Sequence, residues 1–406
     1  MKNKQGRGLA SIGGERIAEL DIIRGVALLG ILLANMPLFS SPYPYHQVLN
    51  VSLWNDGLNQ FVMSFLQIVV EYKFISIFSF LFGLGFIIFM ERLQQRGEKP
   101  VALYVRRLLF LMLLGFLHGH FVWYGDILLI YSLFGFILLL FRNLSPKALL
   151  VTGMGTLLVM ASLLAWQTFG FDNKLSTALA PPPEQMEQLA EQSITVYQTR
   201  SFSEMNSQRS EDANMIRVGM FYNVFLSLGM FFLGAYAGKR GFFRDLDKHR
   251  LTVKRVWIWS AVVGFPFLAL QFVLKEAFDV NHPGLNLAQV PALLIASPAL
   301  AIFYITSLLL LLRTAIGRQW IAPLAVVGRT ALTNYLLQSI ICTTIFYSFG
   351  FGLFAQVSPW LGVLLSFVIY AILAVLSHLW LQRYKFGPME WVWRMVTYGK
   401  IGAIRK

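Results

Sequence analysis

Charged residues are scarce in this sequence: they make up 13% of the 406 residues, whereas hydrophobic residues make up 56%. A soluble domain carries roughly a quarter charged residues, so this scarcity excludes an ordinary soluble protein. The single cysteine, Cys342, excludes an internal disulfide and a thiolate metal cluster. No spacing of His, Asp and Glu resembles a metal site. The composition instead predicts an all-α protein that crosses a lipid bilayer several times.

Apolar runs of about 20 residues, the length that crosses the hydrocarbon core of a membrane, recur along the chain. We expect a polytopic membrane helix bundle of about ten transmembrane helices in a single integral membrane domain, 1–406, with an N-terminal helix group in 20–169 and a C-terminal group in 216–406. The expected spans are 20–39, 74–90, 104–123, 126–141, 148–169, 216–238, 256–275, 289–312, 324–347 and 360–381.

The net charge of +14 supports this count, because ten spans place every cluster of Lys and Arg on the same side of the membrane. The positive-inside rule makes that side the cytoplasm and puts both termini there. No basic and aromatic face accompanies the charge, so we expect no nucleic acid partner. Residues 58–72 would break the pattern as a further span, and we interpret them as a re-entrant or interfacial helix on the outer face. The alternative is an eleventh span with one terminus outside. The more acidic segment 170–215 falls on the non-cytoplasmic side, where it either caps a cavity or is a solvated connector.

The chain from Arg106 to Phe141 predicts a hairpin of two membrane-length helices with His118 and Asp126 near its bend. Ionisable residues at membrane depth are functional candidates by default. His118 could act as a general base, with Asp126 holding its tautomer, or it could only hydrogen-bond to a neighbouring helix. His120 points to a different helix face and is the weaker candidate.

A second group of polar residues falls in the first expected span, 20–39. Asp21 and Arg24 are one helical turn apart and can pair, either to fix the helix at the interface or to leave Arg24 as an anion site. Asn35 lies eleven positions after Arg24, and an isolated Asn there is commonly a helix–helix contact.

The third polar group lies between Gly328 and Gln338. Thr330, Asn334 and Gln338 recur every four residues and so line one helix face, which packs against other helices or lines a cavity. Arg329 marks the cytoplasmic end of this stripe as a second anion anchor. His378 is interpreted as structural, and the tail from Phe386 to Arg394 as an amphipathic interfacial helix anchored by Trp.

Several of these blocks resemble the YeiB-like bacterial membrane proteins, a family of unknown function. The blocks are 20–35, 78–83, 115–119, 125–128, 328–338 and 387–391. The resemblance implies a multi-pass protein of the bacterial inner membrane. That family is distantly similar to transmembrane acyltransferases of the heparan-glucosaminide acetyltransferase and sugar O-acyltransferase type. In the sugar O-acyltransferases a His follows the Arg of the first span. At that position this sequence has Asn35, and the heparan-type branch also has an Asn there. The resemblance therefore implies that the base lies elsewhere, and His118 with Asp126 is the matching candidate.

The leading expectation is a membrane acyltransferase that moves an acyl group from cytoplasmic acyl-CoA to a small-molecule or glycan acceptor at the outer side. Asp21 with Arg24, and the Arg329 to Gln338 stripe, would bind the donor, while His118, Asp126 and Asn35 would share a hollow and carry out transfer. The alternative is a transporter or permease of a small solute or lipid-like molecule, and a membrane scaffold is a third reading. The sequence leaves the acceptor, the acyl group and a homodimer open.

Overall fold

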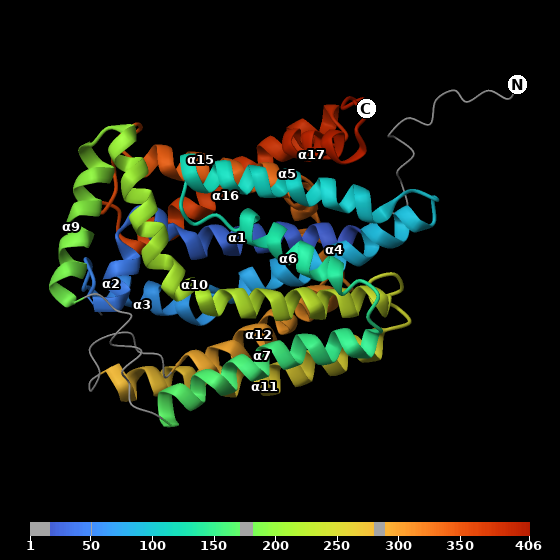
Figure 1. Ribbon diagram of the computed structural model, residues 1–406, viewed down its shortest axis with the longest axis horizontal. Coiled ribbons are helices and arrows are strands. Elements are labelled where there is room, and N and C mark those ends of the chain that lie inside the picture. Colours follow the sequence, from blue (N-terminus) through green and yellow to red (C-terminus); the bar gives the residue numbers. More distant parts are fainter. Residues whose placement is uncertain (1–16, 50, 171–181, 280–288) are drawn as a thin grey trace, which may run out of the picture.

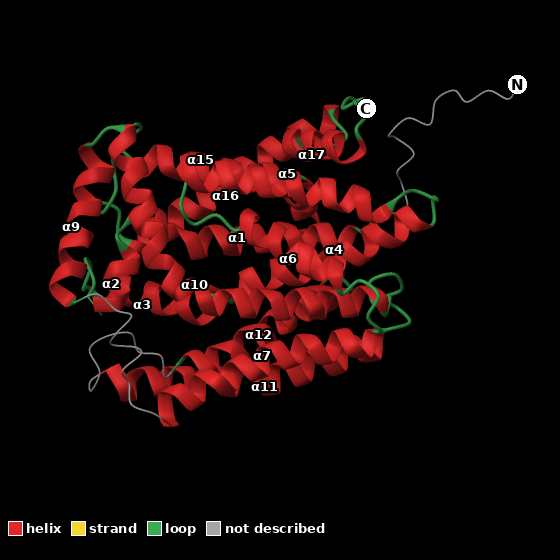
Figure 2. Cartoon of the chain, in the orientation of Figure 1, coloured by secondary structure: helices red, strands yellow, loops and turns green. Residues whose placement is uncertain are grey.

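The computed structural model describes residues 17–49, 51–170, 182–279 and 289–406, which form helices joined by short loops (Figures 1 and 2). In the described part of the chain the one β-bridge pairs Tyr384 with Arg405, so the all-α prediction is confirmed. In chain order the helices are α1 (Ala18–Ser40), α2 (Tyr43–Leu49), α3 (Gly57–Phe65), the π-helical η2 (Leu66–Val70), α4 (Lys73–Gln94), α5 (Pro100–Phe121), α6 (Leu128–Leu140), α7 (Pro146–Gly170), α9 (Pro183–Thr199), α10 (Phe202–Lys239), α11 (Arg250–Asp279), α12 (Val290–Leu311), α13 (Ala315–Ile321), the 3-10 helix η3 (Ala322–Leu324), α14 (Ala325–Arg329), α15 (Ala331–Phe346), α16 (Pro359–Arg383) and α17 (Pro388–Tyr398).

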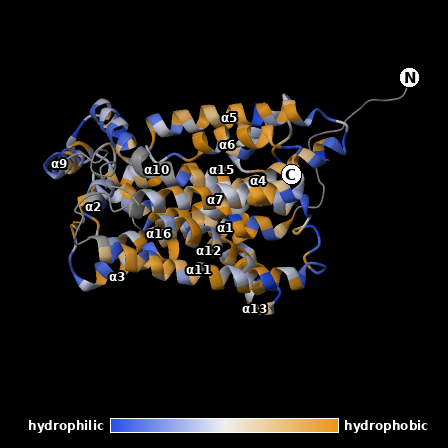
Figure 3. Cartoon of the chain, turned by 60° about the horizontal axis from the view of Figure 1, so that its bottom comes forward, coloured by the Kyte–Doolittle hydropathy of each residue, from blue (hydrophilic) through white to orange (hydrophobic). Residues whose placement is uncertain are grey.

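Among the described residues, seven helical stretches are long and apolar enough to cross a membrane. They are Ala18–Ser40, Gly57–Gln94, Pro100–Phe121, Pro146–Trp166, Arg250–Ala277, Val290–Leu311 and Pro359–Arg383. Figure 3 shows these helices as mainly apolar between two more polar ends. A multi-pass membrane protein is therefore confirmed, while the count of ten spans stays a prediction.

Two predicted spans differ from the helices observed. α6 has 13 residues, a rise of about 20 Å against a hydrocarbon core of about 30 Å, so the hairpin does not consist of two membrane-length helices. The difference arises because the chain from Val122 to Ile127 turns without forming helix. The predicted span 324–347 is divided at Thr330, where α14 ends and α15 begins.

Three loops that carry basic residues lie at one end of the molecule together with α17 (Figure 1). We call this the basic end; it contains the loops 95–99, 141–145 and 240–249. The helices α2, α3 and α9 lie at the opposite end, which we call the capped end. The grouping of basic loops agrees with the expected topology, and the assignment of the basic end to the cytoplasm stays a prediction. The N-terminal tail 1–16 lies outside the described residues.

Residues 58–72 form α3 and η2, and both ends of this segment lie at the capped end. Asn59 Oδ1 accepts a hydrogen bond from the backbone N–H of Trp360, 3.1 Å away, where α16 begins. At the other end Glu71 interacts with Gln47 of α2. Tyr72, with a left-handed φ of 60°, then separates the segment from α4. This geometry agrees with a re-entrant or interfacial helix.

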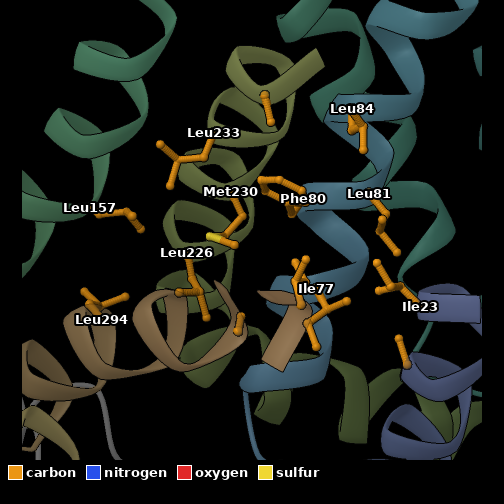
Figure 4. Packing of buried hydrophobic residues seen from close by; sticks show 14 of the residues in the cluster. Ile23, Ile77, Phe80, Leu81, Leu84, Leu157, Leu226, Met230, Leu233 and Leu294 are labelled. Carbon is orange, nitrogen blue, oxygen red and sulfur yellow. The ribbon is translucent and has the colours of Figure 1, made fainter. Parts of the chain in front are cut away.

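The packing of α4 on α10 forms the scaffold behind the hairpin, and two glycines let the backbones touch. A Cβ on Gly83 would lie 1.9 Å from the carbonyl oxygen of Phe231, and one on Gly234 would lie 1.9 Å from that of Phe80. Figure 4 shows the apolar side chains that fill the space around this crossing, with Leu157 of α7 and Leu294 of α12 beside it. The close approach explains why the block 78–83 combines aromatic residues with glycine.

The segment 170–215 is a packed cap rather than a solvated connector, as far as it is described; residues 171–181 lie outside the described part. Its Asp212, 2% exposed, accepts hydrogen bonds from Tyr45 of α2, Tyr197 of α9 and Gln208 of α10 at 2.7, 2.5 and 2.9 Å. Burial raises the pKa of Asp212 above its usual value. The shared acceptor ties three helices together at the capped end.

Candidate functional site

His118 and Asp126 form a buried pair at the bend between α5 and α6. His118 Nδ1 lies 2.9 Å from Asp126 Oδ1, and the two residues are 2% and 7% exposed. The second carboxylate oxygen accepts the backbone N–H of Leu129 at 2.8 Å, so Asp126 also caps the first turn of α6. In the tautomer that directs the Nδ1 proton at the carboxylate, the other ring nitrogen, Nε2, carries the lone pair. The predicted pairing of these two residues is present.

Glycines let the first turn of α6 approach α5 closely enough for this pair to form. A Cβ on Gly115 would lie 2.3 Å from the backbone nitrogen of Leu129 and 2.8 Å from Asp126 Oδ2. One turn later, a Cβ on Gly119 would lie 3.3 Å from Cβ of Asp126. Gly125 is required for another reason, because a side chain there would enter the ring of Trp123 at 2.3 Å. The glycines in the blocks 115–119 and 125–128 therefore set the geometry of the pair.

Tyr335 of α15 completes the surroundings of the imidazole and was not among the predicted site residues. Its ring centroid lies 5.3 Å from that of His118, and its hydroxyl accepts the backbone N–H of Ile127 at 3.3 Å. Tyr335 adjoins Asn334 in the polar stripe, but its own helix face carries no polar pattern that would have pointed to it. The contact places α15 directly against the bend.

His118 Nε2 is buried and has no hydrogen-bond partner among the described residues. A buried polar atom without a partner calls for a ligand, a water or a catalytic role. A cavity of about 30 Å³ lies between Ile127, Tyr131 and Asn223, which is room for about one water. The bend therefore presents a lone pair inside a closely packed interior.

The helices of the capped end cover the bend. Arg209 Nη1 donates to the carbonyl oxygen of Phe121 at 3.0 Å, and Asn206 Nδ2 lies 3.2 Å from Nε2 of His120. His120 is exposed, which agrees with its weaker candidacy. His378 is also exposed, and its Nε2 lies 3.1 Å from the side chain of Gln382. The start of α10 therefore packs against the end of α5 that carries His118.

Asn35 is half-buried in the part of α1 nearer the capped end and makes no side-chain hydrogen bond within the described part of the chain. α1 reaches the bend through its neighbours: Phe39 stacks on Trp123 with ring centroids 4.0 Å apart, and Tyr124 donates to the carbonyl oxygen of Leu38. Within the described ranges no hydrogen bond joins Asn35 to the His118–Asp126 pair.

At the basic end, Arg24 Nη1 donates to Asp21 Oδ1 at 3.1 Å, as the one-turn spacing predicts. The blocks 20–35 and 328–338 meet here, since a Cβ on Gly328 would lie 1.8 Å from the carbonyl oxygen of Asp21. Arg329 follows directly in the chain and is half-buried. Arg24 and Arg329 therefore belong to two helices that touch through their backbones.

The predicted polar stripe is engaged in helix packing. Asn334 Nδ2 donates to Thr330 Oγ1 at 2.9 Å and to Ser377 Oγ of α16 at 3.0 Å. Gln338 Nε2 donates to the carbonyl oxygen of Leu28 at 3.3 Å. The sequence predicted that the stripe runs along one helix. Instead Thr330 lies at the break before α15, so it precedes the helix that carries Asn334 and Gln338.

Glu390 of α17 explains how α15 can begin at this break, and sequence reasoning missed it. Its Oε1 accepts the backbone N–H groups of Leu332 and Thr333 at 2.7 and 3.1 Å, and its Oε2 accepts the Thr333 hydroxyl at 2.6 Å. Gly387 leaves room for this carboxylate, because a Cβ there would lie 2.1 Å from Oε2. The block 387–391 is thus a helix cap supplied from a distant part of the chain.

No group of three or more His, Cys, Asp and Glu residues that could hold a metal ion occurs in the described ranges. At the bend, the side chains that can exchange protons are the imidazole of His118, the carboxylate of Asp126 and the neighbouring hydroxyl of Tyr335. Such a set can accept and return a proton.

Comparison with known proteins identifies the family. Residues 237–400 match the family described as "Protein of unknown function (DUF418)". The chain is 37% identical over 403 residues to the uncharacterized protein YxaH of Bacillus subtilis, with 96% of each chain covered. It is 33% identical over 405 residues to the uncharacterized protein YeiB of Escherichia coli, covering 97% of this chain and 99% of that protein. An uncharacterized 39.9 kDa protein encoded in the amylase 3′ region of Bacillus acidopullulyticus is 32% identical over 401 residues, with 95% of each chain covered. The predicted resemblance is thus confirmed, and the chain belongs to the YeiB-like DUF418 family of unknown function.

Proposed function

We propose that the protein is a membrane acyltransferase that uses an acyl-CoA donor at its basic end. The observation that carries this proposal is the buried His118–Asp126 pair with an unpartnered Nε2. An imidazole held by a carboxylate through one nitrogen presents the other as a general base, the arrangement that activates hydroxyl nucleophiles in acyl transfer.

Each residue of the pair has a defined role in the proposed reaction. His118 Nε2 takes the proton of an acceptor hydroxyl or amine as its oxygen or nitrogen bonds to the acyl carbon. The carbon–sulfur bond of the thioester then breaks, and His118 returns the proton to the leaving thiolate. Asp126 orients the ring and stabilises the imidazolium. The Asn35 side-chain amide, which makes no hydrogen bond to any described residue, is the proposed donor to the oxyanion.

The depths of the polar residues support a donor that reaches from one end of the bundle to the bend. Asn35 follows Arg24 by eleven positions on α1, and His118 follows Arg107 by eleven positions on α5. Both helices start at the basic end, so each arginine lies about 16 Å from its polar partner along the helix axis. A phosphate held at the depth of Arg24 and a thioester at the depth of His118 would thus lie about 16 Å apart along the helix axes, so the donor would have to be an extended molecule.

The closed interior sets a requirement on the proposal. A cavity of about 30 Å³ beside Ile127 cannot hold an acyl group and an acceptor together. The donor must therefore separate helices next to the bend on binding, as closing and opening segments do in many enzymes. The small contact between α1 and the bend through Phe39 and Trp123 is the place where we expect this opening.

The transporter alternative rested on a polar path along α15, and the contacts give that path less support. Thr330 and Asn334 are bonded to Ser377, and Gln338 is bonded to α1. What remains for a transporter is protonation of His118 during a cycle. The enzyme reading uses the same atom and needs no continuous channel.

The test is transfer of a radiolabelled acetyl group from acetyl-CoA to a lipid and glycan extract of bacterial membranes, catalysed by the purified protein in liposomes. The variant His118→Ala should lower the rate by roughly 10² to 10⁴, whereas His120→Ala on the exposed side of the same helix should leave it within about twofold of wild type. A wild-type protein that releases no CoA but moves solutes across the liposome membrane would replace the enzyme with a transporter.

A further inference from the structure

Three arginines from three different helices lie close together at the basic end. The guanidinium of Arg107 on α5 interacts electrostatically with those of Arg394 on α17 and Arg24 on α1. The contact between α5 and α17 is fixed by the Trp393 indole N–H, which donates to the backbone carbonyl of Arg107 at 2.9 Å. Like charges repel, so a cluster of this kind is unfavourable unless an anion compensates it.

Aromatic rings, rather than carboxylates, hold Arg107 in place. Its guanidinium carbon lies 3.6 Å from the ring centroid of Trp393 and 5.2 Å from that of Phe89. The guanidinium of Arg394 is held in the same way, 4.3 Å above Phe386. Stacking on the faces of the guanidinium group leaves the N–H groups in its plane pointing outward.

The N–H groups of the Arg107 side chain have no acceptor in the part of the chain that the structure describes. Among the described residues the Arg107 side chain donates no hydrogen bond and forms no ion pair. It is half-buried, seven positions after the start of α5, or about 10 Å along the helix axis. A guanidinium at that depth in a membrane protein marks a ligand or ion pathway when it has no partner of its own.

We infer that Arg107, together with Arg24 and Arg394, binds the phosphate group of a ligand at the basic end. A planar fork of N–H groups matches two phosphate oxygens, and a second and third guanidinium supply the remaining charge. Two sources carry this chemistry: the nucleotide part of a CoA donor and the headgroup of an anionic phospholipid. Identifying the phosphate with the donor rests on the proposed function; the anion site itself does not.

The experiment measures binding without catalysis. Adenosine 3′,5′-bisphosphate, which carries the phosphates of CoA but no thiol, is titrated by calorimetry into the purified full-length protein in phosphatidylcholine nanodiscs. Arg107→Gln should weaken binding about tenfold to a hundredfold, the effect of losing a charge-assisted hydrogen bond. Arg106→Gln is the matched control, because it removes the same charge from the exposed neighbouring position and should change the dissociation constant less than about twofold.

A second ligand and two further variants separate the possible outcomes. Nanodiscs containing phosphatidylglycerol test the lipid source: tight retention of this lipid that depends on Arg107, with no nucleotide binding, assigns the site to a headgroup. If Arg107→Gln does not fold, Arg394→Gln, on a different helix, tests the same site and should also weaken nucleotide binding. Arg107→Lys should recover only part of the affinity that Arg107→Gln loses. Equal binding of both ligands by the Arg107, Arg394 and Arg106 variants overturns the site.

The same measurements keep this inference apart from the proposed function. Nucleotide binding that depends on Arg107, in a protein that transfers no acyl group, retains the anion site and rejects the acyltransferase. If Arg107→Gln transfers acyl groups at the wild-type rate and binds the nucleotide with wild-type affinity, the acyltransferase proposal is retained and this site is rejected.

Discussion

Two polar regions lie inside this helix bundle, and they differ in whether their hydrogen bonds are complete. Around the start of α15, Asn334 and Thr330 bond to each other and to Ser377, and Glu390 accepts three hydrogen bonds from residues 332 and 333. At the bend, by contrast, the His118–Asp126 pair leaves Nε2 buried without a partner. Both regions were candidates on the same sequence criterion.

The difference separates architecture from chemistry. A buried polar group whose bonds are all made stabilises one arrangement of helices and has nothing left for a ligand. A buried polar group with an open position is unfavourable to the fold and is retained for another reason. By this reasoning the stripe on α15 and the block 387–391 are structural, and the bend is the reactive region.

The largest change in stability should come from the completed network. Glu390→Ala leaves two backbone N–H groups and one hydroxyl at the start of α15 without their acceptor, so we expect the free energy of unfolding to fall by about 2–4 kcal/mol. Thermal unfolding in detergent measures this. Glu390→Gln, which keeps an acceptor oxygen, should lose less than half as much. Unchanged unfolding with lost acyl transfer would move Glu390 to the reactive region and break the comparison.

Residues that act within one apolar run were predictable, and residues that meet across the chain were not. The Asp21–Arg24 pair and the His118–Asp126 pair span three and eight positions, so helix geometry and a tight bend suffice to bring them together. Tyr335 contacts Ile127 across 208 positions and Glu390 contacts Thr333 across 57, and no periodicity encodes such contacts.

The helix bundle itself was predictable because a membrane span is a property of composition and length. The shortness of α6 and the break at Thr330 were not, since both depend on caps. Asp126 caps α6 through a local backbone contact, whereas Glu390 caps α15 from another helix. Arg107 was overlooked because the positive-inside rule already predicts a basic residue near a helix start. Only the folded structure shows that aromatic rings surround its guanidinium and that, among the described residues, it forms no ion pair with a carboxylate.

A smaller effect should sharpen the comparison at the bend. Gly115→Ala places a methyl group 2.8 Å from Asp126 Oδ2 and 2.3 Å from the Leu129 nitrogen, so the first turn of α6 must move away from α5. We expect a loss of about 1–3 kcal/mol of stability and a fall in acyl transfer larger than that loss explains, because the His118–Asp126 distance changes. Unfolding and transfer are measured on the same preparation. Gly155→Ala on α7, where a Cβ has no neighbour within 4 Å, is the control. Transfer that falls only in proportion to folded protein would mean that the pair tolerates displacement.

The smallest effect concerns the cap, where the buried Asp212 accepts hydrogen bonds from Tyr45, Tyr197 and Gln208. Burial raises the pKa of Asp212 above its unfolded value of about 3.8, so the folded protein holds the proton over a pH range where the unfolded chain has released it. The stabilising contribution is full below that unfolded pKa and is lost as pH rises through the folded pKa, by at most about 1.4 kcal/mol per pH unit. Asp212→Asn should remove this slope from a plot of thermal unfolding against pH, while Glu211→Gln at the exposed neighbouring position should keep it. A wild-type slope of opposite sign would show that Asp212 is ionised in the folded cap, with Arg209 as its counter-charge. The cap would then hold a buried ion pair rather than a neutral hydrogen-bonded carboxyl group.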